Sequence, residues 1–176
     1  MQLFLTPHPD APPADPPFEL FATVDHAARF GAVGTLNIWF GVRAPAARFI
    51  LGDGELQRID GLWQTTCFET FLRAEGEENY REWNFAPSGQ WAAYDFAAYR
   101  NGRRDAEVRE PYIRVEDNLT WWTLGATIGV EVGPIWLLGL SVILEEQDGT
   151  RSYWALAHNE GDPDFHDPVC FAARLA

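Results

Sequence analysis

Glu69 is the residue of this sequence whose neighbours most suggest binding chemistry. It lies in the run LWQTTCFETFL, residues 62–72, close to two phenylalanines. A carboxylate among aromatic side chains lies either at the rim of a core or against a ligand, because burying it without a partner is costly. In an extended strand alternate side chains share a face, so Trp63 and Glu69 are expected on the same surface.

A carboxamide is predicted to join these two groups. The loop RAEGEEN is followed by the strand-like run YREWNF, and a hairpin centred between Gly76 and Glu77 places Asn84 opposite Glu69, on its face. An indole, a carboxylate and a carboxamide are the groups that a sugar needs, as a platform for its C–H face and as partners for its hydroxyls. The alternative is a solvated or Arg-paired Glu69, with Trp63 filling the edge of the core.

The order and spacing of several motifs resemble a known family. The run WQTTCFETFL, residues 63–72, and the later WNFAPSG, residues 83–89, are similar to the W-x-D-D-x-x-E-x-F-L and F-x-x-N-P-x-G pattern of family 9 carbohydrate-binding modules and the related DOMON domains. The C-terminal segments WALAH, residues 154–158, and PDFHDP, residues 163–168, fit the bacterial DOMON-like branch. The resemblance covers about residues 35–176.

This resemblance implies a non-catalytic β-sandwich of two antiparallel sheets that binds sugar or haem. Trp63 and Glu69 fall on the family's ring and carboxylate, while Phe165 or His166 would supply the second ring, with Asp162 near a polar loop position. The family's paired aspartates are Thr65 and Thr66 here, which argues against a calcium role. Together, the two lines of reasoning predict a ligand site without a cofactor, formed by Trp63, Glu69, Asn84, Asp162, Phe165 and His166.

Short aromatic and β-branched runs separated by turn residues indicate the fold. About ten such runs predict an all-β fold, a two-sheet antiparallel sandwich or jelly roll, in a single domain over residues 1–176. The proline-rich residues 6–17 are predicted to connect two strands. Asp148-Gly149 and Pro87-Ser88-Gly89 are expected hairpin turns. In LTWWTLGATIGV, the alternate residues that begin at Trp122 are expected to face the core, and those that begin at Trp121 are expected to face water or a partner.

Charge and composition narrow the possible functions. The net charge is −13 and every basic residue is Arg, so nucleic acid and anionic membranes would be repelled, and a neutral or cationic ligand is favoured. The absence of Lys excludes Schiff-base chemistry on a lysine. The N-terminal sequence lacks the pattern of a signal peptide or membrane span, which predicts a cytoplasmic protein. Cys67 and Cys170 are expected to be free thiols rather than a disulfide.

Four alternatives remain at this stage. Haem would need two of the histidines as ligands, because the chain has only Met1 and no Lys. Zinc could be held by His158, Asp162, Asp164 and His166, although a structural role for His158 is favoured. Glycoside hydrolysis would pair Glu69 with Glu82 or Asp95. An exposed aromatic face around Trp121 would instead suit a protein partner or a homodimer.

Overall fold

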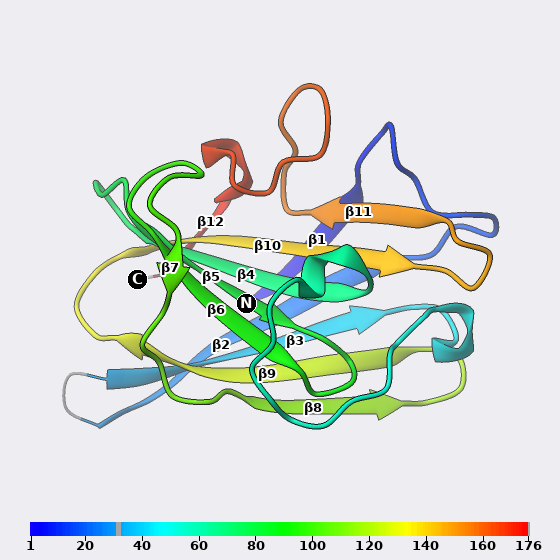
Figure 1. Ribbon diagram of the computed structural model, residues 1–176, viewed down its shortest axis with the longest axis horizontal. Coiled ribbons are helices and arrows are strands. Elements are labelled where there is room, and N and C mark those ends of the chain that lie inside the picture. The colour runs from blue at the N-terminus through cyan, green and yellow to red at the C-terminus, as the bar shows by residue number, and fades with distance from the viewer. Residues whose placement is uncertain (31–32, 176) are drawn as a thin grey trace.

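The computed structural model, in which residues 1–30 and 33–175 are described, is built almost entirely of antiparallel strands (Figure 1). The predicted all-β class is confirmed. Three 3₁₀ turns interrupt the strands: η1 (Ala46–Arg48), η2 (Leu62–Gln64) and η3 (Pro168–Cys170). The strands are β1 (Gln2–Pro7), β2 (Leu20–Phe30), β3 (Val33–Val42), β4 (Cys67–Ala74), β5 (Tyr80–Phe85), β6 (Trp91–Phe96), β7 (Arg104–Asp105), β8 (Tyr112–Asp117), β9 (Trp122–Glu131), β10 (Trp136–Glu145), β11 (Arg151–Ala155) and β12 (Ala173–Leu175).

Hydrogen bonding through β1 joins the strands into one continuous curled sheet, so the predicted division into two separate sheets is not confirmed. Their order is β7-β6-β5-β4-β10-β11-β1-β2-β3-β9-β8, with β12 beside β10. The join is β1, whose residues Gln2–Leu5 pair with β2 and whose Thr6 and Pro7 pair with β11. β1 therefore links two halves of the sheet, one running from β7 to β11 and the other from β2 to β8 in the order above. No motif in the sequence predicts that β1 pairs with two strands.

The main hydrophobic core lies between the two halves of the curled sheet. Ile38 of β3 and Leu124 of β9 belong to the same buried cluster as Phe68 of β4 and Leu140 of β10. The predicted inward parity of β9 is confirmed, because all five of its residues from Trp122 to Val130 are buried. The opposite parity is less exposed than predicted. Gly125 lies under the ring of Trp39, and a β-carbon added there would come within 2.5 Å of that ring.

A second apolar cluster covers the opposite face of the β4–β6 half. Phe71 of β4, Tyr94 of β6 and Ile143 of β10 pack there against Phe165 and Phe171 of the segment that follows β11. This segment, orange to red in Figure 1, runs along the outer side of β10. The strands of this half are therefore buried on both faces, and the C-terminal segment forms a wall above the second face.

The predicted turns lie where expected. Asp148-Gly149 joins β10 to β11, and residues 87–89 join β5 to β6. The hairpin of β4 and β5 has the predicted register, with Glu69 opposite Asn84. Residues 6–17 contribute the end of β1 and most of the connection to β2, and both cysteines are free thiols. No helix in the described part of the chain is long and apolar enough to cross a membrane.

Candidate functional site

A cavity of about 400 Å³ opens on the second face, between the sheet and the C-terminal segment. Its floor comes from β4, β5, β6 and β10, and its walls come from η2, the loop before β7, β11 and the C-terminal segment. η2 directly precedes β4 and the loop before β7 directly follows β6, whereas the C-terminal segment comes from a part of the chain far from β4–β6. Except for Ile143 and Pro163, the lining side chains are aromatic or charged. The lining residues are Trp63, Glu69, Glu82, Tyr94, Phe96, Arg100, Arg103, Ile143, Tyr153, Pro163, Phe165 and His166.

Two buried carboxyl groups form the floor. Glu69 is 3% exposed and Glu82 is 5% exposed. Because Glu69 faces Asn84 across the hairpin and Glu82 is two residues earlier on the same strand, the two carboxyls are diagonal neighbours on one face. Ser141 donates a hydrogen bond to Glu69 Oε2 at 2.8 Å, and Asn84 Nδ2 donates to Glu82 Oε1 at 2.8 Å. Each carboxyl therefore has one short hydrogen bond from a neutral donor.

Burial makes both carboxyls hold their protons unusually tightly. Desolvation, reinforced by the neighbouring Glu82, raises the pKa of Glu69 to about 8. Desolvation also raises the pKa of Glu82 to about 7, against the opposing effects of the Asn84 hydrogen bond and of Arg103 and Arg100. Near neutral pH the floor can therefore exist in protonated or ionised form, and a bound group can select between them.

Trp63 forms one wall, although not in the way the sequence predicts. It lies in η2, before β4 begins, so strand parity does not set its direction. The turn nevertheless brings the ring to the cavity. The Arg103 guanidinium carbon lies 5.2 Å from the centre of the Trp63 ring and 4.0 Å from that of Tyr94. Arg103 also pairs with Asp60, which accepts a 2.5 Å hydrogen bond from Tyr94.

The C-terminal segment forms the other wall, held by an ion pair and by ring contacts. Arg100 pairs with Asp164 at 2.7 Å. His166 Nδ1 lies 2.8 Å from the Tyr80 hydroxyl oxygen. Burial, with a further contribution from Arg100, lowers the pKa of His166 to about 4, so its ring is neutral at physiological pH. Phe165 packs near Tyr153 of β11, with ring centres 6.3 Å apart.

Four of the six predicted site residues line this cavity: Trp63, Glu69, Phe165 and His166. Asn84 is fully buried behind the floor, where it contacts Glu82 rather than the cavity. Asp162 is exposed outside the lining, and its backbone carbonyl accepts a hydrogen bond from Asn159. Whether the six bind a ligand stays a prediction.

Several lining residues are not among those predicted from the sequence. Glu82 is expected there only as a catalytic partner for Glu69, and Tyr94 and Phe96 are not predicted to belong to the site. Arg100 and Arg103 were missed because they belong to a loop, where neither parity nor register applies. Glu82 and Tyr94 could have been found, since cross-strand pairing places Tyr94 opposite Glu82 on the same face.

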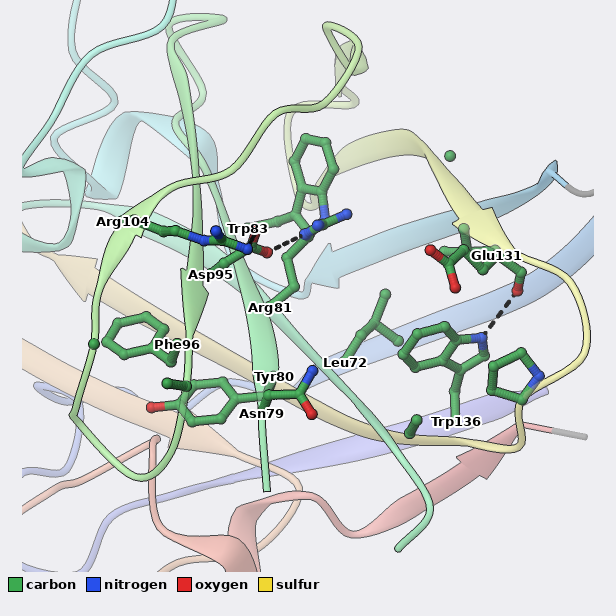
Figure 2. Close-up of a pocket in the computed structure, with 16 residues that line it drawn as sticks. Leu72, Asn79, Tyr80, Arg81, Trp83, Asp95, Phe96, Arg104, Glu131 and Trp136 are labelled. Carbon is green, nitrogen blue, oxygen red and sulfur yellow. Dashed lines mark hydrogen bonds and ion pairs between the residues drawn. The ribbon is translucent and has the colours of Figure 1, made fainter. Parts of the chain in front are cut away.

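A second cavity, of about 620 Å³, lies between the two halves of the sheet (Figure 2). Arg81 and Arg104 both pair with Asp95 at its edge, at 2.7 and 3.5 Å. Figure 2 also shows the Trp136 indole, which donates a 3.1 Å hydrogen bond to the Glu131 carbonyl. Arg81, Arg104 and Asp95 are thus paired with one another, and none of the predicted binding residues lines this cavity.

The described residues do not support the alternative zinc site. Among the residues that the structure describes, no three His, Cys, Asp or Glu side chains form a group suited to a metal ion. His158 Nε2 lies 2.7 Å from the Thr6 carbonyl oxygen, in keeping with the structural role favoured for it. Asp164 is held by an ion pair with Arg100.

Comparison with solved structures finds proteins of similar fold. A protein of Bacteroides uniformis, described as a proposed carbohydrate-binding protein, superposes with a TM-score of 0.60 at 17% identity, over 97% of this chain and 83% of that one. A family 9 carbohydrate-binding module of Caldicellulosiruptor kristjanssonii, solved with glucose, gives a TM-score of 0.51 at 12% identity, over 84% of this chain and 71% of that one.

The protein thus has a fold like that of family 9 carbohydrate-binding modules, as the motif resemblance implied. No family profile matches the sequence. No curated protein matches it either.

Proposed function

We propose that the protein is a non-catalytic carbohydrate-binding domain whose ligand enters the cavity over Glu69 and Glu82. The observation that carries the proposal is the cavity itself, which is lined by a half-buried indole and two buried carboxyls. Its volume of about 400 Å³ suits a ligand the size of a mono- or disaccharide. The similarity to a module solved with glucose supports this choice of ligand class.

The lining supplies both kinds of contact that sugar recognition needs. Trp63 and Phe165 offer aromatic surface to the C–H face of a pyranose. Glu69 and Glu82 offer oxygen acceptors to its hydroxyls, and Arg100 and Arg103 offer N–H donors at the rim. A protein partner is the less favoured alternative, because its best feature, the outward aromatic side chains such as Trp39 and Trp121, is not an enclosed site.

Titration calorimetry with glucose and cellobiose tests the proposal. Wild-type protein is expected to give saturable heat, and Trp63→Ala is expected to weaken binding by about tenfold or more, because the ring contributes stacking area. Glu69→Gln keeps the shape of the floor but changes its acceptors, and we expect a loss of similar size. Leu119→Ala, a change at a highly exposed side chain outside the cavity lining, is the matched control and should bind normally.

The outcomes separate the candidate functions. Absence of binding to any sugar in a glycan panel, with the fold intact by circular dichroism, would overturn the proposal. Release of nitrophenol from nitrophenyl glycosides would instead make Glu69 and Glu82 a catalytic pair, as glycoside hydrolysis uses two carboxyls. Loss of stability in Glu69→Gln without loss of binding would make Glu69 structural.

A further inference from the structure

The floor of the cavity has more hydrogen-bond acceptors than donors. We propose, resting on the carbohydrate-binding function above, that the preferred ligand is a sugar bearing a protonated amine, whose ammonium group lies between Glu69 and Glu82. This choice goes beyond a neutral sugar, and the following observations of contacts, charge and shape lead to it.

The acceptors of the floor exceed what the protein satisfies. Glu69 and Glu82 present four carboxyl oxygens, and in the described structure only Ser141 and Asn84 donate short hydrogen bonds to them. His166 Nε2 is 3.7 Å from Glu82 Oε2, too far for a hydrogen bond. An ammonium group carries three N–H donors and no acceptor, so it complements such a floor better than a hydroxyl does.

The negative charge that Glu69 and Glu82 carry when they are ionised has little counter-charge in the cavity. Arg100 is paired with Asp164 and Arg103 with Asp60, so each guanidinium at the rim already has its own carboxylate. Among the described residues, His166, whose pKa is lowered, is the one basic side chain within salt-bridge distance of either Glu69 or Glu82. Burial raises the pKa of the Tyr94 phenol at the cavity, so this group carries no charge at physiological pH. A cationic group on the ligand would supply the missing charge.

The position of the floor fits an amine on a ring rather than a simple metal ion or a long polyamine. Trp63 and Phe165 line the same cavity as the two carboxyls, so a sugar ring can contact an aromatic side chain while a substituent at its edge reaches the carboxyls. The overall charge of −13 adds a long-range attraction for cations. In the free protein, the proton that burial retains on the pair fills the place of the ammonium group. Binding should therefore release that proton.

Calorimetry with glucosamine, glucose and N-acetylglucosamine at pH 6.5 and low salt tests the proposal. Glucosamine is expected to bind at least about tenfold more tightly than glucose, since a charge-assisted hydrogen bond is roughly twice as strong as a neutral one. N-acetylglucosamine, whose nitrogen is uncharged, should show no such advantage. Repeating the titration in buffers of different ionisation enthalpy should reveal proton release with glucosamine alone.

Glu82→Gln removes one ionisable carboxyl with little change of shape and should reduce the preference for glucosamine to about twofold or less. Glu78→Gln, at an exposed position in the β4–β5 turn, makes the same chemical change outside the cavity and should keep the preference. Equal binding of glucose and glucosamine, or tighter binding of glucuronate, would overturn the inference but leave the proposed function intact. Binding of no sugar at all would overturn both. The comparison of glucosamine with glucose on the wild-type protein tests the proposal even if Glu82→Gln does not fold.

Discussion

Glu69 and Glu82 are carboxyl groups that the fold keeps away from water at a cost in stability. A carboxyl with a raised pKa in the folded state binds a proton more tightly when folded than when unfolded. The folded protein is therefore favoured most below the unfolded pKa of about 4.5, and this advantage is lost as pH rises through the folded values of about 7 and 8. Keeping such a pair is easiest to understand if a ligand uses it.

The first prediction concerns this pair in the absence of ligand. The double variant Glu69→Gln with Glu82→Gln should be more stable than wild type at pH 8, by about 1–3 kcal/mol, because it removes buried carboxylates with too few donors. At pH 5, where wild type is protonated, the difference should nearly vanish. Urea unfolding at the two pH values measures it. A difference that does not change with pH would show that the two carboxyls titrate normally.

Single residues also show what the sequence could and could not reveal. Glu69 and Asn84 were predicted correctly as cross-strand partners, because the turn after β4 is short and side chains alternate along both strands. Trp63 came to the cavity for a different reason from the predicted one, since η2 and not a strand carries it. Arg100 and Arg103 could not be placed, because a loop has no period that relates residue number to direction.

At the level of elements, the hairpins were the most predictable part of the fold. The Asp148-Gly149 turn and the alternating pattern of β9 are local signals that tertiary packing did not override. The pairing of β1 with both β2 and β11 was not predictable, because long-range strand order depends on the whole set of exposed edges rather than on any one segment. The wall above Glu69 depends in turn on how the C-terminal segment packs on β10.

Gly139 of β10 is the position where that packing is closest. A β-carbon there would lie 3.2 Å from the Cys170 carbonyl oxygen and 3.3 Å from the Phe71 β-carbon. Gly139→Val should push η3 outward, destabilise the protein by about 1–3 kcal/mol and weaken sugar binding, because Phe165 and His166 belong to the same segment. Chemical denaturation and calorimetry measure the two effects.

The matched control is Gly129→Val in β9, where an added β-carbon would make only an ordinary 3.6 Å contact with Val33. It should change stability by less than about 1 kcal/mol and leave binding unchanged. If Gly139→Val binds sugar like wild type while it loses stability, the C-terminal wall does not contribute to the site.

At the scale of the whole molecule, the curled sheet is joined through β1, and the connection that follows β1 is anchored to the far end of β10. Arg48 pairs with Glu146 and donates hydrogen bonds to the carbonyls of Ala14 and Pro16. Glu146 in turn accepts a 2.9 Å hydrogen bond from the Ala14 backbone N–H. The proline-rich connection thus has few internal hydrogen bonds but is fixed by one buried ion pair.

Breaking this pair should weaken the molecule as a unit rather than one loop. Glu146→Gln leaves the largely buried Arg48 without its counter-charge, and we expect a loss of about 2–4 kcal/mol in the free energy of unfolding. Glu75→Gln, which removes an exposed pair with Arg174, should cost less than about 1 kcal/mol. Because β1 links the two halves, both variants should unfold in one transition by tryptophan fluorescence and circular dichroism. Two separate transitions in Glu146→Gln would mean that the halves of the sheet are stable independently, and that β1 is an accessory strand rather than the join.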